Sequence, residues 1–193
     1  PVLWDKKLNV IVNNESSEII RMFNSAFNQL TGNELNLYPA HLQTQIDEVN
    51  DFVYHRINNG VYKSGFASTQ QSYDENVTIL FDALQQLDDK LATQRYLTGS
   101  ELTEADWRLW STLIRFDAVY HTHFKCNLQL IKEYNNLYHY MLELYQMPNI
   151  AGTVNMAHIK RHYYASHLAI NSYGIVPLGH NQDWSVPHHR ELI

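Results

Sequence analysis

The sequence has only one cysteine, Cys126, among its 193 residues. A single cysteine excludes a disulfide within the chain and is typical of a reducing compartment such as the cytosol. Long hydrophobic runs are also missing, because charged residues interrupt the apolar stretches before they reach the length of about 18 residues that a membrane span needs. We therefore expect a cytoplasmic protein with neither a transmembrane helix nor a secretory signal peptide.

Positive charge is in short supply as well. The chain has 14 lysines and arginines against 20 aspartates and glutamates, which gives a formal net charge of −6 with its 11 histidines neutral. Without a basic stripe to bind a phosphate backbone, nucleic acid is not expected as a partner. Aromatic residues are plentiful, with 13 tyrosines and 4 tryptophans. They suit flat, ring-shaped ligands, although an aromatic core is the simpler explanation of the composition alone.

Residues 1–24 have the pattern of a strand, a turn, a second strand and a helix. Residues 1–4 are apolar and residues 10–12 are β-branched, with a polar turn between them. Apolar side chains then recur at helical spacing over residues 15–24. Two strands and one helix cannot cover both faces of a sheet, so this segment is interpreted as the final part of an α/β domain.

Residues 25–193 are predicted to form an all-helical domain with an extended tail. Thr103-Glu104-Ala105-Asp106 has the form of a capping box, and the helix that it opens is apolar on more than one side, so we expect that helix to be central. Asn58-Asn59-Gly60 predicts the end of a helix, and the return of glycine and proline after residue 171 predicts a non-helical tail. The predicted helices span residues 41–58, 72–91, 103–116, 137–146 and 154–167.

Two features are candidates for ligand binding on their own chemistry. Glu15 and Ser16 stand at a predicted helix start, where free backbone N–H groups and the serine hydroxyl favour an anion. An N-cap with a purely structural role explains the same pair. Tyr62 lies in a glycine-flanked segment just after a predicted helix end, which we interpret as a loop. With 13 tyrosines in the chain, a half-buried structural role is the simpler reading for any one of them.

The histidines and the cysteine give weaker signals. His158 and His162 are one helical turn apart with His167 nearby, but no HExxH motif, carboxylate cluster or cysteine accompanies them. His188-His189 in the tail is weaker still. We predict no metal site, and we interpret Cys126 as a structural thiol.

Five separated strings carry a resemblance that covers essentially the whole chain. Together they resemble the glutathionyl-hydroquinone reductases, also called xi-class glutathione transferases. The strings are NESSEIIR at 14–21, GVYKSGFA at 60–67, TEADWR at 103–108 with RFDAVY at 115–120, HFKCN at 123–127, and HIK at 158–160 with HYY at 162–164.

The resemblance implies a mostly α fold, in which an all-helical glutathione-transferase C-terminal domain follows a partial thioredoxin-like ββα unit. It implies that Glu15 and Ser16 bind the γ-glutamyl end of glutathione, and that the backbone of Val2, after a cis-proline matched by Pro1, pairs with its cysteinyl part. Tyr62 and Tyr163 would face the aromatic substrate and donate to a hydroquinone oxygen, with Tyr164 as a third, weaker member of the aromatic pocket. Glutathione would be the co-substrate, and the family forms homodimers through its helical domain.

The chain departs from the family in one main respect. The family's nucleophile is a cysteine in a Cys-Pro-Trp-Ala motif, which this sequence does not contain. In the family, that thiolate attacks the sulfur of a glutathionyl-hydroquinone, and a second glutathione resolves the mixed disulfide. We therefore expect part of such a reductase, supplying the aromatic pocket and part of the glutathione site. The alternative is a truncated, non-catalytic protein of the same fold that binds ligands or pairs with another subunit.

Overall fold

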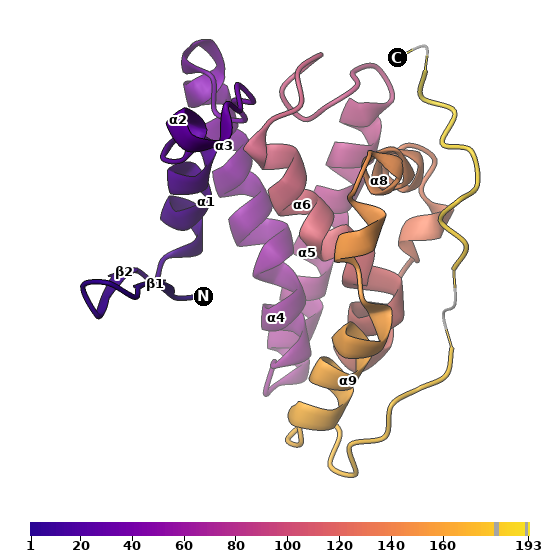
Figure 1. The fold of residues 1–193 in the computed structure, drawn as a ribbon. Helices are drawn as coiled ribbons and strands as arrows, with labels where there is room; N and C mark the ends of the chain where they lie inside the picture. The colour runs from indigo at the N-terminus through magenta and orange to yellow at the C-terminus, as the bar shows by residue number, and fades with distance from the viewer. Residues whose placement is uncertain (180–181, 192) are drawn as a thin grey trace.

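The computed structural model describes residues 1–179, 182–191 and 193, which form a small hairpin followed by packed helices (Figure 1). The strands are β1 (Leu3–Asp5) and β2 (Val10–Asn13). The α-helices are α1 (Ser16–Ser25), α2 (Asn28–Thr31), α3 (Gln43–Val53), α4 (Gly60–Gly65), α5 (Gln70–Leu91), α6 (Glu104–Arg115), α7 (His121–His123), α8 (Leu137–Gln146) and α9 (Met156–Ser166). Short 3-10 turns are η1 (Ala40–Leu42), η4 (Ile131–Glu133) and η5 (Ala151–Thr153), and π-helical turns are η2 (Tyr54–Asn58) and η3 (Phe116–Tyr120). The predicted mostly α fold class is confirmed.

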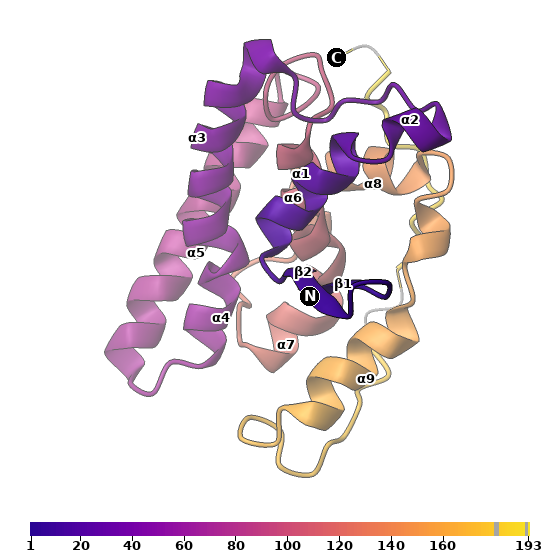
Figure 2. The same ribbon diagram turned by 60° about the vertical axis from the view of Figure 1, so that its left-hand side comes forward.

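The hairpin and α1 follow the predicted order of strand, turn, strand and helix. Strands β1 and β2 pair antiparallel, and the carboxylate of Asp5 closes the turn by accepting hydrogen bonds from the N–H groups of Lys7 at 2.8 Å and Leu8 at 2.9 Å. Helix α1 begins at Ser16, and the Glu15 side chain caps it by accepting from the N–H of Ser17 at 3.3 Å. The second strand of the hairpin therefore leads directly into the start of α1 (Figure 2).

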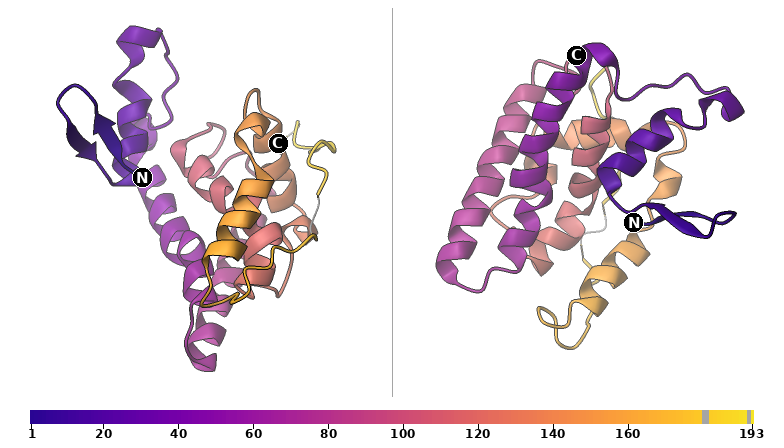
Figure 3. Two further views of the ribbon diagram at one scale, coloured as in Figure 1. Left: turned by 60° about the horizontal axis from the view of Figure 1, so that its bottom comes forward. Right: turned by 90° about the vertical axis from the view of Figure 1, so that its left-hand side faces the viewer.

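Helix α6 lies at the centre of the helical part, as its apolar pattern predicts. Helices α3, α4 and α5 lie on one side of it and α8 and α9 on the other, while the hairpin stands apart from the bundle (Figures 2 and 3). Leu109 and Leu113 of α6 are almost completely buried. Because α6 packs against the helices on both sides, the side chains on its surface have fixed positions relative to both groups of helices.

The predicted end of a helix at Asn58-Asn59-Gly60 is wrong. Helix α3 passes through the π-helical turn η2 into α4, so Tyr62 lies on a helix and not on the expected loop. The side chain of Asn58 donates to the Thr112 hydroxyl at 2.6 Å and to the Arg108 carbonyl at 3.1 Å on α6. An asparagine whose amide is bound to a neighbouring helix does not compete for its own backbone, and the helical path continues.

The capping box at Thr103 is confirmed. The Asp106 carboxylate accepts hydrogen bonds from the N–H groups of Thr103 at 2.8 Å and Leu97 at 2.9 Å, and from the Tyr140 hydroxyl of α8 at 2.8 Å. Burial raises the pKa of the Asp106 carboxyl, and these donors oppose that shift. One side chain thus fixes the start of α6, the preceding loop and α8.

Glu104, in the same turn of α6, holds the N-terminal unit. Its buried carboxylate accepts from the Arg21 guanidinium of α1 at 2.8 Å and from the Asn50 amide of α3 at 2.9 Å. Arg21 also pairs with Asp47 of α3 at 2.6 Å. These contacts set the position of α1, and hence of Glu15 and Ser16, relative to α6.

The described residues after residue 171 form no helix, as predicted, and they return along the helices (Figure 1). Arg190 is 1% exposed and anchors it, donating to Glu143 of α8 at 3.1 Å and to the carbonyl of Leu91 at 3.0 Å. Lys160 of α9 donates to the Gly179 carbonyl at 2.9 Å. In the described residues, no helix combines the length and the apolar character that crossing a membrane requires.

Replacing Gly65 by alanine should destabilise the fold. A Cβ atom at Gly65 would overlap the buried Phe124 ring and lie 2.6 Å from the Phe124 Cβ. We expect Gly65→Ala to lower the free energy of unfolding by about 1–3 kcal/mol, measured by urea denaturation. At Gly152 a Cβ would meet nothing within 4 Å, so Gly152→Ala should change stability by no more than about 0.5 kcal/mol. Equal effects of the two substitutions would contradict this packing.

Candidate functional site

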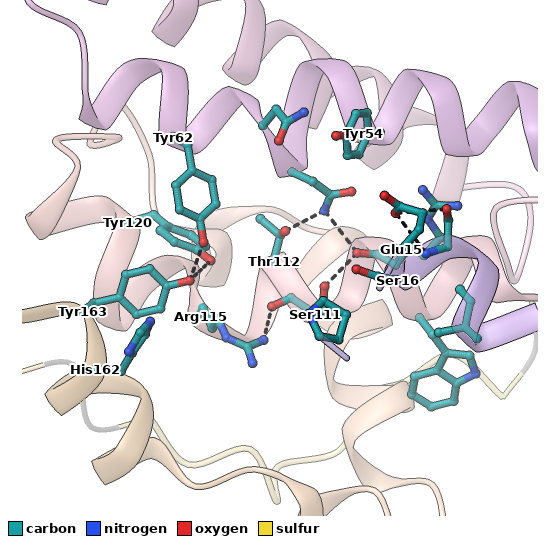
Figure 4. A pocket seen from close by; sticks show the side chains of 17 residues that line it. Glu15, Ser16, Tyr54, Tyr62, Ser111, Thr112, Arg115, Tyr120, His162 and Tyr163 are labelled. Atoms are coloured by element: carbon teal, nitrogen blue, oxygen red, sulfur yellow. Dashed lines mark hydrogen bonds between the residues drawn. The ribbon is translucent and has the colours of Figure 1, made fainter. Parts of the chain in front are cut away.

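One open cavity of about 970 Å³ joins the start of α1 to helices α4, α6 and α9 (Figure 4). Glu15 and Ser16 lie at one end of it, and Tyr62, Tyr120 and Tyr163 lie at the other. Its volume is in the range of clefts that hold molecules of cofactor or drug size. The structure thus brings four of the predicted site residues into a single space.

The end of the cavity at α1 is polar. Glu15 is oriented by its neighbours: its N–H donates to the Asn13 side chain at 2.6 Å, and its carboxylate accepts from the Ser17 hydroxyl at 3.2 Å as well as from the Ser17 N–H. Among the described residues, the Ser16 hydroxyl has no hydrogen-bond partner. A helix N-terminus with a free hydroxyl and an adjacent carboxylate can bind a group that carries both a negative and a positive charge.

At the other end, three tyrosine hydroxyls form a chain with Tyr163 in the middle. Tyr163 is 2.7 Å from the Tyr62 hydroxyl and 2.9 Å from the Tyr120 hydroxyl. Two hydrogen bonds use two of the three hydroxyl hydrogens, so one hydrogen stays available. Because Tyr120 is 3% exposed, we infer that it donates to Tyr163, which gives its hydrogen an acceptor inside the protein. Tyr163 then donates to Tyr62, whose own hydrogen remains for a ligand in the cavity.

The surroundings keep two of these phenols, Tyr120 and Tyr163, neutral. Burial raises the pKa of Tyr163 to about 12, although the hydrogen bond from Tyr120 and the positive charge of Arg115 lower it. Burial also raises the pKa of Tyr120 far above its ordinary value. Near neutral pH the hydroxyls of Tyr120 and Tyr163 therefore act as hydrogen-bond donors and not as bases.

A cluster of rings fixes where the hydroxyls point. Phe124 is fully buried, stacks on Tyr120 with ring centroids 5.5 Å apart, and lies 5.2 Å from the Tyr62 ring. Tyr120 ends the π-helical turn η3, and Tyr163 comes from α9. Side chains from three separate elements are thereby held in one arrangement.

Two of the predicted site residues lie elsewhere. Tyr164 is buried and is not among the described residues that line the cavity, and its hydroxyl donates to the Ala118 carbonyl at 3.2 Å. Val2 is 60% exposed and also lies outside the lining, whereas its neighbour Pro1 belongs to it.

Several cavity residues escape sequence reasoning. Tyr120, Arg108, Ser111 and Arg115 line the cavity but lie on a stretch whose apolar spacing predicts only a core helix. A spacing of three or four residues connects Arg108, Ser111, Thr112 and Arg115, which places them on one face of α6. This helical spacing is the signal that could have indicated them. Tyr120 gives no such signal, because the π-helical turn changes which face it occupies.

Of the remaining candidates, His162 lines the cavity beside Tyr163, whereas Cys126 and His167 are not among its described lining residues. Cys126 is fully buried, and burial raises the pKa of its thiol to about 12, so it is unreactive. His123 and His167 contact each other at 3.2 Å, and burial lowers the pKa of His123 to about 4. Within the described ranges, no three histidine, cysteine, aspartate or glutamate side chains come together as a metal site requires.

Comparison with known proteins gives consistent matches. The family model for the glutathione S-transferase C-terminal domain matches residues 70–143. The glutathionyl-hydroquinone reductase YqjG of Escherichia coli K12 is 55% identical over 192 residues, which is 100% of this chain and 58% of that relative. Its glutathione-bound structure superimposes with a TM-score of 0.97, covering 100% of this chain and 62% of that one. A xi-class glutathione transferase from Natrialba magadii is 50% identical with a TM-score of 0.97, covering 100% and 59%.

The chain thus spans about three fifths of the length of the relatives it matches. Identity is high over the whole of the shared length, and the fold is the same. This chain belongs to the xi-class glutathione transferases, the family of the glutathionyl-hydroquinone reductases.

Proposed function

We propose that this chain forms the substrate cavity of a glutathione-dependent reductase that removes glutathione from glutathionyl-hydroquinones. The observation that carries the proposal is that Glu15 and Ser16 share one cavity with Tyr62 and Tyr163. A glutathionyl-hydroquinone is a charged peptide joined through sulfur to a phenolic ring, so its two parts match the two ends. The names of the E. coli relative and of its glutathione-bound structure agree with this substrate.

Glutathione would bind at the α1 end. Ser16 and the first N–H groups of α1 would receive the α-carboxylate of the γ-glutamyl residue, and Glu15 would pair with its ammonium group. The backbone of Val2, next to Pro1 at the cavity edge, would pair with the cysteinyl part. The Arg21–Glu104 ion pair at 2.8 Å would hold this end at a fixed distance from the tyrosines.

The hydroquinone ring would bind at the tyrosine end. Tyr62 has the spare hydrogen, so it would donate to a ring oxygen and stabilise negative charge that develops there. Tyr163 would direct that hydrogen by donating to Tyr62. Tyr164 would contribute from behind the wall, because its bond to Ala118 ties α9 to the turn that carries Tyr120.

The reaction would be a thiol exchange. A thiolate attacks the glutathionyl sulfur, the carbon–sulfur bond breaks, and the ring takes the electron pair and a proton to leave as the hydroquinone. A second glutathione then displaces the first nucleophile, and the products are the hydroquinone and oxidised glutathione. Cys126 cannot be the nucleophile, because it is fully buried and its thiol pKa is about 12. The thiolate would therefore come from a group other than this cysteine.

The inert cysteine also favours a second candidate function. Cys126 is the only cysteine of the sequence. A chain with this cavity and no reactive thiol of its own can bind glutathione conjugates or aromatic compounds without transforming them. The proposed function includes two further points. The resemblance implies that two copies pair through the helical domain, and the composition implies a cytoplasmic location.

Loss of the Tyr62 hydroxyl should weaken binding of the ring. We expect Tyr62→Phe to raise the Kd for methylhydroquinone roughly three- to tenfold, because one hydrogen bond to the ligand is lost, as calorimetric titration would show. Tyr163→Phe should also raise the Kd, because it interrupts the chain of three hydroxyls. Tyr173→Phe is the matched control, since Tyr173 is 88% exposed and lies outside the cavity lining. Unchanged affinity in Tyr62→Phe would contradict the assignment.

Cys126 should resist alkylation in the folded protein. With its pKa raised from 9.0 to about 12 by burial, the thiol stays protonated at pH 9, where an exposed cysteine would be half ionised. We expect iodoacetamide labelling at pH 9 to be slower than labelling of the urea-unfolded chain by about 100-fold or more, followed by mass spectrometry. Equal rates would show an accessible thiol and would reopen its role in the chemistry.

A further inference from the structure

Arg115 is the unexplained charge of the cavity. It lies at the C-terminal end of α6 and lines the cavity, yet the proposed roles of the tyrosines, Glu15 and Ser16 leave it without a task. Its guanidinium has five N–H donors, and one of them donates to the Ser111 carbonyl of its own helix at 2.5 Å. Among the described residues, Arg115 forms no ion pair.

The other arginine of the cavity differs in this respect. Arg108 has the Glu104 carboxylate 3.9 Å away, and Arg21, Arg95 and Arg190 also have acidic partners. A guanidinium that is only partly exposed and unpaired beside a cavity is suited to bind an anion from a ligand.

The position of Arg115 selects which part of the ligand it can reach. Its positive charge lowers the pKa of Tyr163, so the guanidinium acts on the tyrosine end. In Figure 4 it points into the cavity beside Tyr163 and His162, with Glu15 and Ser16 on the far side of Ser111. The acidic residue of the lining is Glu15, at that far end. The tyrosine end is therefore positively charged and has no carboxylate of its own in the described lining.

We propose that Arg115 binds an anionic substituent on the aromatic ring, so that the cavity prefers hydroquinones that carry a carboxylate over uncharged ones. This inference rests on the proposed function, because it assumes that the ring lies at the tyrosine end. The fork of the guanidinium matches the two oxygens of a carboxylate, while Tyr62 retains its hydrogen for a ring oxygen. Arg115 is then a specificity-determining residue, whereas the tyrosines serve any hydroquinone.

Two probes, one anionic and one uncharged, test the proposal: (2,5-dihydroxyphenyl)acetate and its methyl ester. Calorimetric titration of the purified chain should give a Kd for the carboxylate that is roughly five- to tenfold lower than that for the ester. Arg115→Met should remove the difference and leave the Kd for the ester nearly unchanged. Arg115→Lys should keep part of it, because the charge remains but the fork is lost.

Controls separate this role from general effects. Arg161→Met removes the same charge from an exposed position of α9 outside the cavity lining, and it should keep the full preference. Thermal unfolding followed by circular dichroism would verify each fold. If Arg115→Met does not fold, Arg115→Gln takes its place, since it keeps a polar group able to reach the Ser111 carbonyl.

The outcomes are distinguishable. The proposal is overturned if the unsubstituted chain shows no preference for the carboxylate over the ester, or if that preference survives Arg115→Met. The ring pocket itself remains supported in that case, provided that the ester still binds and that Tyr62→Phe weakens its binding. Failure of both probes to bind overturns the ring pocket and this inference together. Weaker binding of glutathione itself to Arg115→Met would assign the guanidinium to a peptide carboxylate and would also overturn the proposal.

Discussion

The first turn of α6 is where the two parts of the chain are held together. Glu104 receives Arg21 from α1 at 2.8 Å, and Asp106, two residues later, receives Tyr140 from α8 at 2.8 Å. Both carboxylates are almost completely buried, so each would destabilise the fold strongly if it lost its donors. Their partners are therefore fixed in place. Helix α6, which carries the two carboxylates, thereby sets the positions of the elements that line the cavity.

The cavity depends on the position of α6 because its two ends come from distant parts of the sequence. Glu15 and Ser16 are positioned through Arg21, whereas Tyr163 is positioned by packing against Tyr120 at the end of the same helical path. The tyrosines are held in place from one side, since Phe124 fills the space beneath them and Gly65 lets that ring approach the backbone of α4. The direction of a hydrogen bond to a ligand is therefore set before the ligand arrives.

Local signals in the sequence were sufficient for some elements and for a part of the site. The β-branched run, the turn at Asp5 and the capping box at Thr103 act over a few residues, so the hairpin and the start of α6 could be predicted correctly. The resemblance indicated Glu15, Ser16, Tyr62 and Tyr163, which the structure brings to one cavity.

What the sequence could not supply depends on contacts between distant residues. The Arg21–Glu104 pair joins residues 83 positions apart, and no local pattern indicates it. Asn58-Asn59-Gly60 has the composition of a helix end, but bonds from Asn58 to α6 keep the helical path going. The π-helical turn η3 likewise turns Tyr120 toward the cavity from a stretch that reads as core. In each case tertiary packing overrides a local preference.

We propose that one cavity holds the peptide and the ring of the same molecule. Titration of the chain with glutathionyl-methylhydroquinone, compared with glutathione and methylhydroquinone separately, tests it most directly. If both ends bind at once, the linked compound should have a Kd at least roughly tenfold lower than that of either part, because the second contact becomes intramolecular. A Kd no lower than that of the tighter-binding part would show that the two ends do not act on one ligand, and it would contradict the account.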